Sequence, residues 1–214
     1  MALQTSGAIS IIDLVDEFQP AGLGSLSAPH SLSEFYSVAA GIPASGTISL
    51  EDFYEASAET GIKTITEGTT SYNFVSGKLG GTDYLYGYGL DAEELRAPAG
   101  DAIGTWNNSS FGSISPTTYN GVTIEGAAYY TSTFVPLPEF IIVLQGNRAK
   151  SFFATVTPQG GNTLTSASAT HSYTSAGNYT KWFWREATYG ETAVLGAGIA
   201  AQWNGTGTST ITFT

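Results

Sequence analysis

After residue 70, short segments with the composition of β-strands recur along the chain. Each is rich in aromatic or β-branched residues and is bounded by Gly, Asn, Pro or Ser, which favour turns. The segments are YNFVSGKL, DYLYGYG, GVTIEGAAYY, FIIVLQG, KSFFATVT, NTLTSASAT, YTKWFWRE and TSTITFT. Many short strands at regular spacing predict an antiparallel sandwich or barrel. The low charged fraction of 12% and the 26 Gly residues agree with this fold class.

The segment YTKWFWRE alternates as a strand with one buried face does. Trp182 and Trp184 fall on one face, opposite the polar Lys181. We expect both indoles in the core or in a subunit interface; the alternative is an exposed platform that stacks on sugar rings. Trp106 and Trp203 lie in polar, Gly-rich surroundings, where we expect more exposure.

The first 57 residues have a different pattern, which predicts short helices. A Ser is followed three residues later by an acidic residue in SIID, SLSE and SLED, beginning at Ser10, Ser31 and Ser49. This is the spacing of a capping box, in which the Ser and the acid each bond a free backbone N–H. The apolar residues that follow the boxes are Leu14, Phe18, Phe35, Tyr36, Phe53 and Tyr54. Because helices of about two turns are not stable alone in water, these faces must pack on each other or on a partner.

The sequence therefore predicts a mainly β protein with a small helical module. We expect a docking module of short helices over residues 1–57, a Thr- and Gly-rich linker over 58–70, and an antiparallel β-sandwich domain over 71–214. The amino terminus lacks the basic and apolar regions of a secretory signal, and no apolar run approaches the about 20 residues of a membrane span.

The net charge of -11 is concentrated near the amino terminus. Up to Thr60 the chain has no Lys or Arg, whereas acidic residues recur from Asp13 to Glu59. Such a surface repels phosphate, so we expect no nucleic-acid partner. We interpret it as a solubilising face, and a docking surface for a basic partner is the alternative.

The sequence shows no recognisable catalytic set, and we expect neither an enzyme nor a cofactor. No Cys is present, and neither His30 nor His171 lies in a Ser/His/Asp or metal-binding pattern. Carboxylates cluster in LDAEELRAPAGDAIG, at Asp91, Glu93, Glu94 and Asp101. We interpret this stretch as an exposed helical turn with an Arg at its end; the alternatives are Ca²⁺ binding and a glycosidase pair.

Two parts of the sequence resemble structural proteins of tailed bacteriophage virions. The order SGAIS, SLSEFY and GIPASGTISLEDFY resembles a recurring segment of tail and fibre proteins, although Gln19, Pro20 and Glu55 depart from its usual pattern. FGSISPTTYNGVTI, LQGNRAKSFFATVT, NTLTSASAT and NYTKWFW resemble a β-rich unit of phage and prophage virion proteins. The resemblance implies a structural role in the virion.

The expected function is therefore that of a tail-fibre or baseplate-attached protein, assembled in the bacterial host cytoplasm. The helical module would dock on other virion proteins or on sister subunits, with a homo-oligomer, such as a trimer, as the expected state. The β domain would serve assembly or attachment to a host-surface glycan, for which the candidate contacts are Tyr86, Tyr88, Trp106 and Trp203. The alternatives are a capsid decoration protein, a glycan-binding module and a glycan depolymerase.

Overall fold

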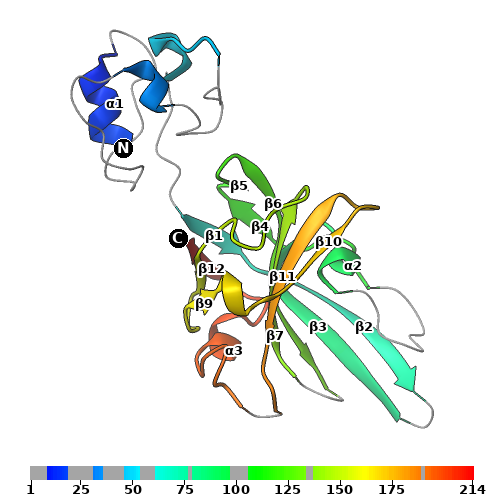
Figure 1. Ribbon diagram of the computed structural model, residues 1–214. Helices are drawn as coiled ribbons and strands as arrows, with labels where there is room; N and C mark the ends of the chain where they lie inside the picture. The colour runs from blue at the N-terminus through cyan, green and yellow to red at the C-terminus, as the bar shows by residue number, and fades with distance from the viewer. Residues whose placement is uncertain are drawn as a thin grey trace. The chain divides into compact units, whose positions relative to one another are not determined.

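The chain forms two compact units in the computed structural model (Figure 1). The structure describes residues 9–18, 31–35, 46–53, 61–76, 79–96, 106–133, 137–188 and 191–214. One unit comprises residues 1–60 together with 118–122, and the other comprises 61–117 and 123–214. Within the described residues, no helix is long and apolar enough to cross a membrane.

The N-terminal unit contains three short helices. They are the α-helix α1 (Ile11–Phe18) and the 3-10 helices η2 (Leu32–Phe35) and η3 (Leu50–Phe53). The sequence predicted all three, since each begins directly after the Ser of a capping box.

The capping box at Ser10 is formed as predicted, whereas in the box at Ser49 the acid binds the backbone N–H and the Ser hydroxyl donates to Asp52 Oδ2 at 3.3 Å. The backbone N–H of Ser10 donates to Asp13 Oδ2 at 2.7 Å, and the Asp13 N–H donates back to Ser10 Oγ at 3.4 Å. The Ser49 N–H donates to Asp52 Oδ2 at 2.7 Å. The acid of the third box, Glu34, has a side chain outside the described residues. Local hydrogen bonding thus fixes where α1 and η3 begin.

The apolar faces of these helices pack on each other. Leu14, Phe35 and Phe53 are fully buried, and the rings of Phe35 and Phe53 meet edge to face at 6.1 Å. Ile9 and Val15 complete the buried cluster. Of the two expected arrangements, packing on each other or on a partner, Leu14, Phe35 and Phe53 adopt the first and make the unit's own core. These three side chains are therefore not exposed as docking contacts. The side chain of Phe18 and all of Tyr36 and Tyr54 lie outside the described residues.

The second unit is an antiparallel β-sandwich, as the sequence predicted. The strands of the two sheets are β1 (Ile62–Thr66), β2 (Gly68–Ser76), β3 (Leu79–Gly89), β4 (Ser113–Ser115), β5 (Thr118–Tyr119), β6 (Val122–Ser132), β7 (Glu139–Gln145), β8 (Thr155–Pro158), β9 (Leu164–Thr165), β10 (Thr170–Thr174), β11 (Tyr179–Arg185) and β12 (Thr208–Phe213). Of these, β5 and the first residue of β6 are grouped with the first unit. The smaller sheet has the order β4-β1-β12-β8-β9. The larger has the order β10-β11-β7-β6-β3-β2, with β5 paired to β6.

Strand β1 begins inside residues 58–70, where the sequence predicted a linker. It pairs with β12 on one side and with β4 on the other. Glu67 separates β1 from β2, so the chain passes from one sheet to the other at this residue. Its buried carboxylate accepts the backbone N–H groups of Asn204 and Gly205 at 3.0 and 2.8 Å and the Ser209 hydroxyl. The Thr and Gly content of residues 58–70 suggested a linker, yet Ile65 is fully buried.

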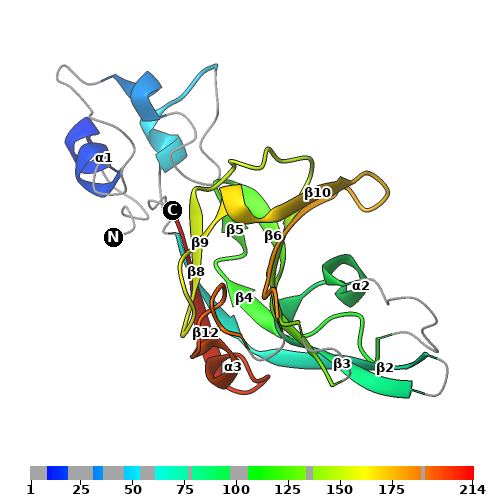
Figure 2. The ribbon, with the colours of Figure 1, turned by 60° about the horizontal axis from the view of Figure 1, so that its bottom comes forward.

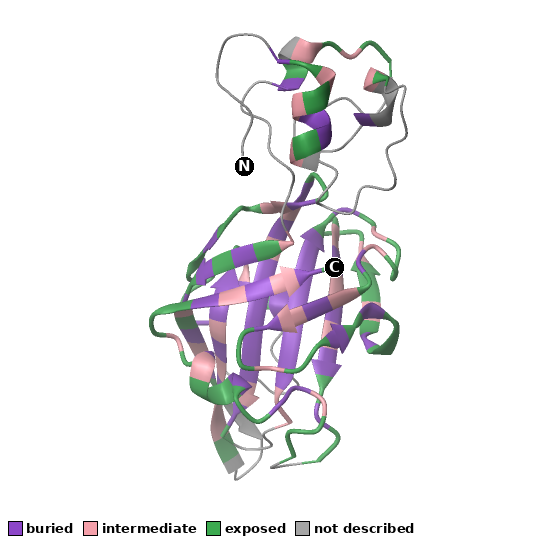
Figure 3. Cartoon of the chain, turned by 90° about the vertical axis from the view of Figure 1, so that its left-hand side faces the viewer, coloured by how far each residue is buried: buried purple, intermediate pink, exposed green. Residues whose placement is uncertain are grey.

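Aromatic side chains fill the space between the sheets. Trp182 and Trp184 are buried there, as predicted, and each contacts Phe153. Phe153 lies in the connection between β7 and β8 and also contacts Phe213. Figure 3 shows buried residues along the strands and exposed residues mainly in the connections. The remaining short helices are α2 (Ala92–Leu95), η4 (Ser166–Ser168) and α3 (Ile199–Gln202).

Candidate functional site

A second apolar cluster lies on the face of the larger sheet opposite Trp182 and Trp184. Helix α2 contacts β7 and β3 on this face. The buried members are Tyr72, Leu85, Ala92, Leu95, Trp106, Phe111, Ala128, Tyr130, Ile141 and Val143. Gly126 of β6 makes room for α2, since a Cβ there would come within 2.7 Å of Leu95 Cδ2. The candidate site is a group of charged side chains at the margin of this cluster, Arg96, Glu139, Lys181 and Arg185.

The acidic stretch that begins at Asp91 forms the start of α2. Asp91 Oδ1 accepts the Glu93 N–H at 2.9 Å, so this carboxylate caps the helix. Burial, and then the charge of Asp91, raises the pKa of Glu94. Asp101 lies outside the described residues, and in the described part of the chain no three His, Asp or Glu side chains gather in a metal-binding arrangement. The predicted helical turn is present.

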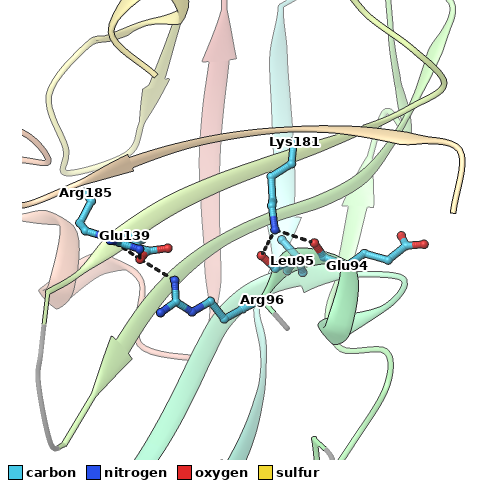
Figure 4. Close-up of polar contacts among 6 residues, drawn as sticks. All are labelled: Glu94, Leu95, Arg96, Glu139, Lys181 and Arg185. Atoms are coloured by element: carbon cyan, nitrogen blue, oxygen red, sulfur yellow. Dashed lines mark hydrogen bonds and ion pairs between the residues drawn. The ribbon is translucent and has the colours of Figure 1, made fainter. Parts of the chain in front are cut away.

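At the end of α2, Arg96 reaches a buried carboxylate on the sheet (Figure 4). Its Nη1 lies 2.6 Å from Glu139 Oε1, and Arg185 Nε donates to the same oxygen at 2.6 Å. Arg185 stands directly opposite Glu139 in the β11–β7 register, so strand pairing brings the two together. The Glu139 side chain is 2% exposed, whereas those of Arg96 and Arg185 are 24% and 43% exposed. We call these three residues the Arg–Glu–Arg cluster.

Lys181 makes a second polar link between β11 and α2. Its Nζ donates to the backbone oxygens of Glu94 and Leu95, at 3.3 Å each (Figure 4). These are the last carbonyls of the short helix, where a cation is favourable. Burial, followed by the charge of Arg96, lowers the pKa of Lys181. For Arg96, burial opposes the charged form, but Glu139, together with Tyr130 and Asp83, more than offsets it, so the pKa of Arg96 is raised.

A second buried carboxylate lies near the Arg–Glu–Arg cluster. Asp83 of β3 is 3% exposed, and its Oδ1 has no hydrogen-bond partner among the described residues. The Arg96 guanidinium lies over the Tyr130 ring, 4.4 Å from its centroid. Burial raises the pKa of Tyr130, and the charge of Arg96 counters only part of this effect. The phenol therefore stays protonated and neutral between the two carboxylates.

This arrangement holds α2 to the sheet. One buried carboxylate receives hydrogen bonds from guanidinium groups on two separate elements, and a third cation binds the helix end. Charge-assisted bonds of this kind are among the stronger ones in proteins, and they fix geometry as well as energy. The site therefore links α2 and Arg96 to strands β7 and β11.

The predicted saccharide contacts are mostly buried. Trp106 donates its indole N–H to the Arg96 carbonyl at 2.9 Å, and Trp203 donates to the Gln159 carbonyl at 3.1 Å. Their predicted exposure is therefore wrong, because each polar edge finds a backbone acceptor and lets the ring enter a core. Tyr88 is also buried, with its hydroxyl bonded to the Ile124 carbonyl.

Tyr86 alone among these candidates is partly exposed. It stacks on Tyr84, with ring centroids 5.8 Å apart and planes 4° from parallel. Tyr86 therefore remains the one predicted saccharide contact that the structure leaves partly exposed. His171 is placed within the sandwich, 5.0 Å from the Trp182 ring, and His30 lies outside the described residues.

Sequence reasoning missed the polar residues of this site. Lys181 was placed correctly opposite the Trp pair of β11, but the partners of Lys181 and Arg185 come from distant parts of the chain. A signal was present at Glu139, a charged residue at the start of the apolar run FIIVL, where an unpaired carboxylate is unfavourable.

Comparison of the chain with protein-family models, with curated proteins and with solved structures finds no match.

Proposed function

We propose that the protein is a structural component of a phage virion, a tail-fibre or baseplate-attached subunit that docks through its N-terminal unit. The observation that supports this most is the division of the chain into a small helical unit with its own core and a separate β-sandwich. An attachment module joined to a projecting domain has this organisation. The resemblance of both parts of the sequence to virion proteins points the same way.

In this proposal, the N-terminal unit contacts the virion through side chains of α1 that are not part of its buried core. Ile12 of α1 is 59% exposed, although the same helix buries Leu14 and Val15. Asp16 is exposed on the same helix, and the first 60 residues contain no Lys or Arg. A docking partner would therefore present an apolar contact flanked by basic groups. The sandwich would face outward, for assembly contacts or for attachment to the host surface.

Immunogold labelling of particles of the phage that encodes the chain tests where the protein lies in the virion. Label at the tail tip or baseplate is expected, whereas label on heads would instead assign the chain to capsid decoration. Particles without label would contradict a virion role.

A point variant tests the docking surface. Ile12→Asp should reduce incorporation into particles severalfold without unfolding the unit, because the side chain is already in solvent. Ile62→Asp is the matched control, since Ile62 of β1 is 53% exposed but lies in the sandwich. Equal incorporation of both variants would contradict docking through α1.

A further inference from the structure

The four edge strands of the two sheets, β2, β4, β9 and β10, differ in how well they are covered. An uncovered edge strand offers free backbone N–H and C=O groups to another chain. The edge of β2 is met by residues 107–108, since the Asn107 N–H donates to the Ser71 carbonyl at 2.9 Å and Thr70 Oγ1 donates to the Asn108 carbonyl. In the smaller sheet, β4 has three residues and is followed by Pro116, and β9 has two. These edges offer little room for pairing.

Strand β10 is different. Its five residues pair with β11 in continuous register, and in the described part of the chain no other backbone hydrogen bonds reach them. The strand, THSYT, contains no Lys, Asp, Glu or Pro, which are the residues that usually block an edge. Tyr173 is 40% exposed. Figure 2 shows β10 at the rim of the larger sheet.

We propose that β10 pairs antiparallel with β10 of a second copy of this chain, about a twofold axis at Ser172. Ser172 then faces the same residue of the other copy, His171 faces Tyr173, and Thr170 faces Thr174. In an antiparallel strand, every second residue points its backbone N–H and C=O toward the free edge. Pairing about Ser172 places residues of the same alternate set opposite each other, so the edge-facing groups of one copy meet those of the other. The larger sheets of the two copies become one continuous sheet.

The side chains of this pairing are mutually compatible. His171 and Tyr173 lie on one face, so each His171 meets an aromatic ring of the other copy on one side and Trp182 of its own chain on the other. The opposite face carries only Thr170, Ser172 and Thr174. No like charges face each other, and aromatic and hydroxyl pairs at such positions are stabilising.

Engineered cysteines test both the pairing and its register, because the chain has no Cys of its own. With Ser172→Cys, the two introduced sulfurs lie across the axis, where directly opposed Cβ atoms are about 5 Å apart. With Thr174→Cys on the same face, equivalent residues are about 14 Å apart, too far for a disulfide. Oxidation should yield a covalent dimer for Ser172→Cys and monomer for Thr174→Cys. Equal crosslinking of both, or of neither, would overturn the proposal.

Sedimentation of the full chain supplies an independent readout. The wild type should show a concentration-dependent equilibrium between monomer and dimer. Ser172→Asp places two carboxylates opposite each other in the dimer, but sits beside Lys181 of its own chain, so the fold should be kept. We expect its dimer dissociation constant to rise about threefold to tenfold. Thr64→Asp, on a strand paired at both edges, is the control and should leave the constant unchanged.

A strictly monomeric wild type, or a trimer, would overturn the pairing. Both experiments use purified protein, so they can fail while the labelling of particles succeeds, and the reverse also holds.

Discussion

The N-terminal unit packs a handful of apolar side chains from three short helices, whereas the sandwich buries two apolar clusters and an ionic group between strands and α2. In the first unit, hydrogen bonds lie within single capping boxes, between residues three apart. In the second, Arg96 and Glu139 are 43 residues apart. We infer that local hydrogen bonds set where the helices of the N-terminal unit begin, and that its few apolar contacts stabilise their packing. The sandwich depends instead on contacts between residues far apart in the sequence.

The largest expected effect is in the N-terminal core. Phe35→Ala removes a fully buried ring that contacts Phe53, a change that typically costs about 3–5 kcal/mol. So small a core is expected to unfold. All four Trp residues lie in the sandwich, so the Trp fluorescence transition should stay unchanged while amide protection of residues 11–18 is lost. A shift of the Trp transition equal to that of a sandwich core variant would contradict separate units.

Next is the Arg–Glu–Arg cluster. Glu139→Gln removes the charge that Arg96 and Arg185 share and should lower the free energy of unfolding of the sandwich by about 2–3 kcal/mol. The effect is below that of a fully buried pair because Arg185 is 43% exposed. Urea unfolding followed by Trp fluorescence measures it. Arg185→Gln is the control, with an expected cost of about 1 kcal/mol, and an equal loss for both variants would contradict the assigned roles.

A smaller effect concerns pH and the sandwich. Burial, together with the charge of Glu94, raises the pKa of Glu125 from 4.5 to about 7, and its Oε2 has no hydrogen-bond partner among the described residues. Since the folded pKa exceeds the unfolded one, this group favours folding at low pH, and that contribution is lost as the pH rises from 4.5 to about 7. Glu125→Gln should stabilise the sandwich at pH 8 by about 1 kcal/mol, after allowing for solvent screening, and change little at pH 4.

Urea unfolding of Glu125→Gln and the wild type at pH 4 and pH 8 measures this change in the stability of the sandwich. Amide exchange of α1 in the same variant should be unchanged if the N-terminal unit folds separately. Equal stabilisation at pH 4 and pH 8 would show that Glu125 does not titrate as stated.

The smallest effects are in the capping boxes. Ser10→Ala removes the hydroxyl that accepts the Asp13 N–H and should cost the N-terminal unit about 1 kcal/mol, measured by amide exchange of that unit. The hydrogen bonds from the Ser10 hydroxyl and backbone lower the pKa of Asp13 below 3.8. Its contribution is therefore present above pH 3.8 and is lost as the pH falls through the lowered pKa, opposite in sign to Glu125. Asp13→Asn should abolish this acid dependence; an unchanged dependence would exclude the box as its source.

Local features were predictable from the sequence, and distant contacts were not. The boxes at Ser10 and Ser49 and the alternation of β11 depend on neighbouring residues, so pattern alone identified them. No local pattern pairs Glu139 with Arg96, and none decides whether helices with an apolar face pack on each other or on a partner. The exposure predicted for Trp203 was wrong because polar sequence neighbours such as Asn204 do not reveal the distant Gln159 carbonyl that accepts its indole N–H.

The central claim is that the N-terminal unit is a folded module with its own core, stable independently of the sandwich. Hydrogen exchange on the full chain tests it most directly, by comparing amides of α1 with those of β7 in the wild type and in Phe35→Ala. We predict that α1 is protected in the wild type and loses this protection in the variant, while protection of β7 is unchanged. Unprotected α1 amides in the wild type, or a parallel loss in α1 and β7, would contradict the claim.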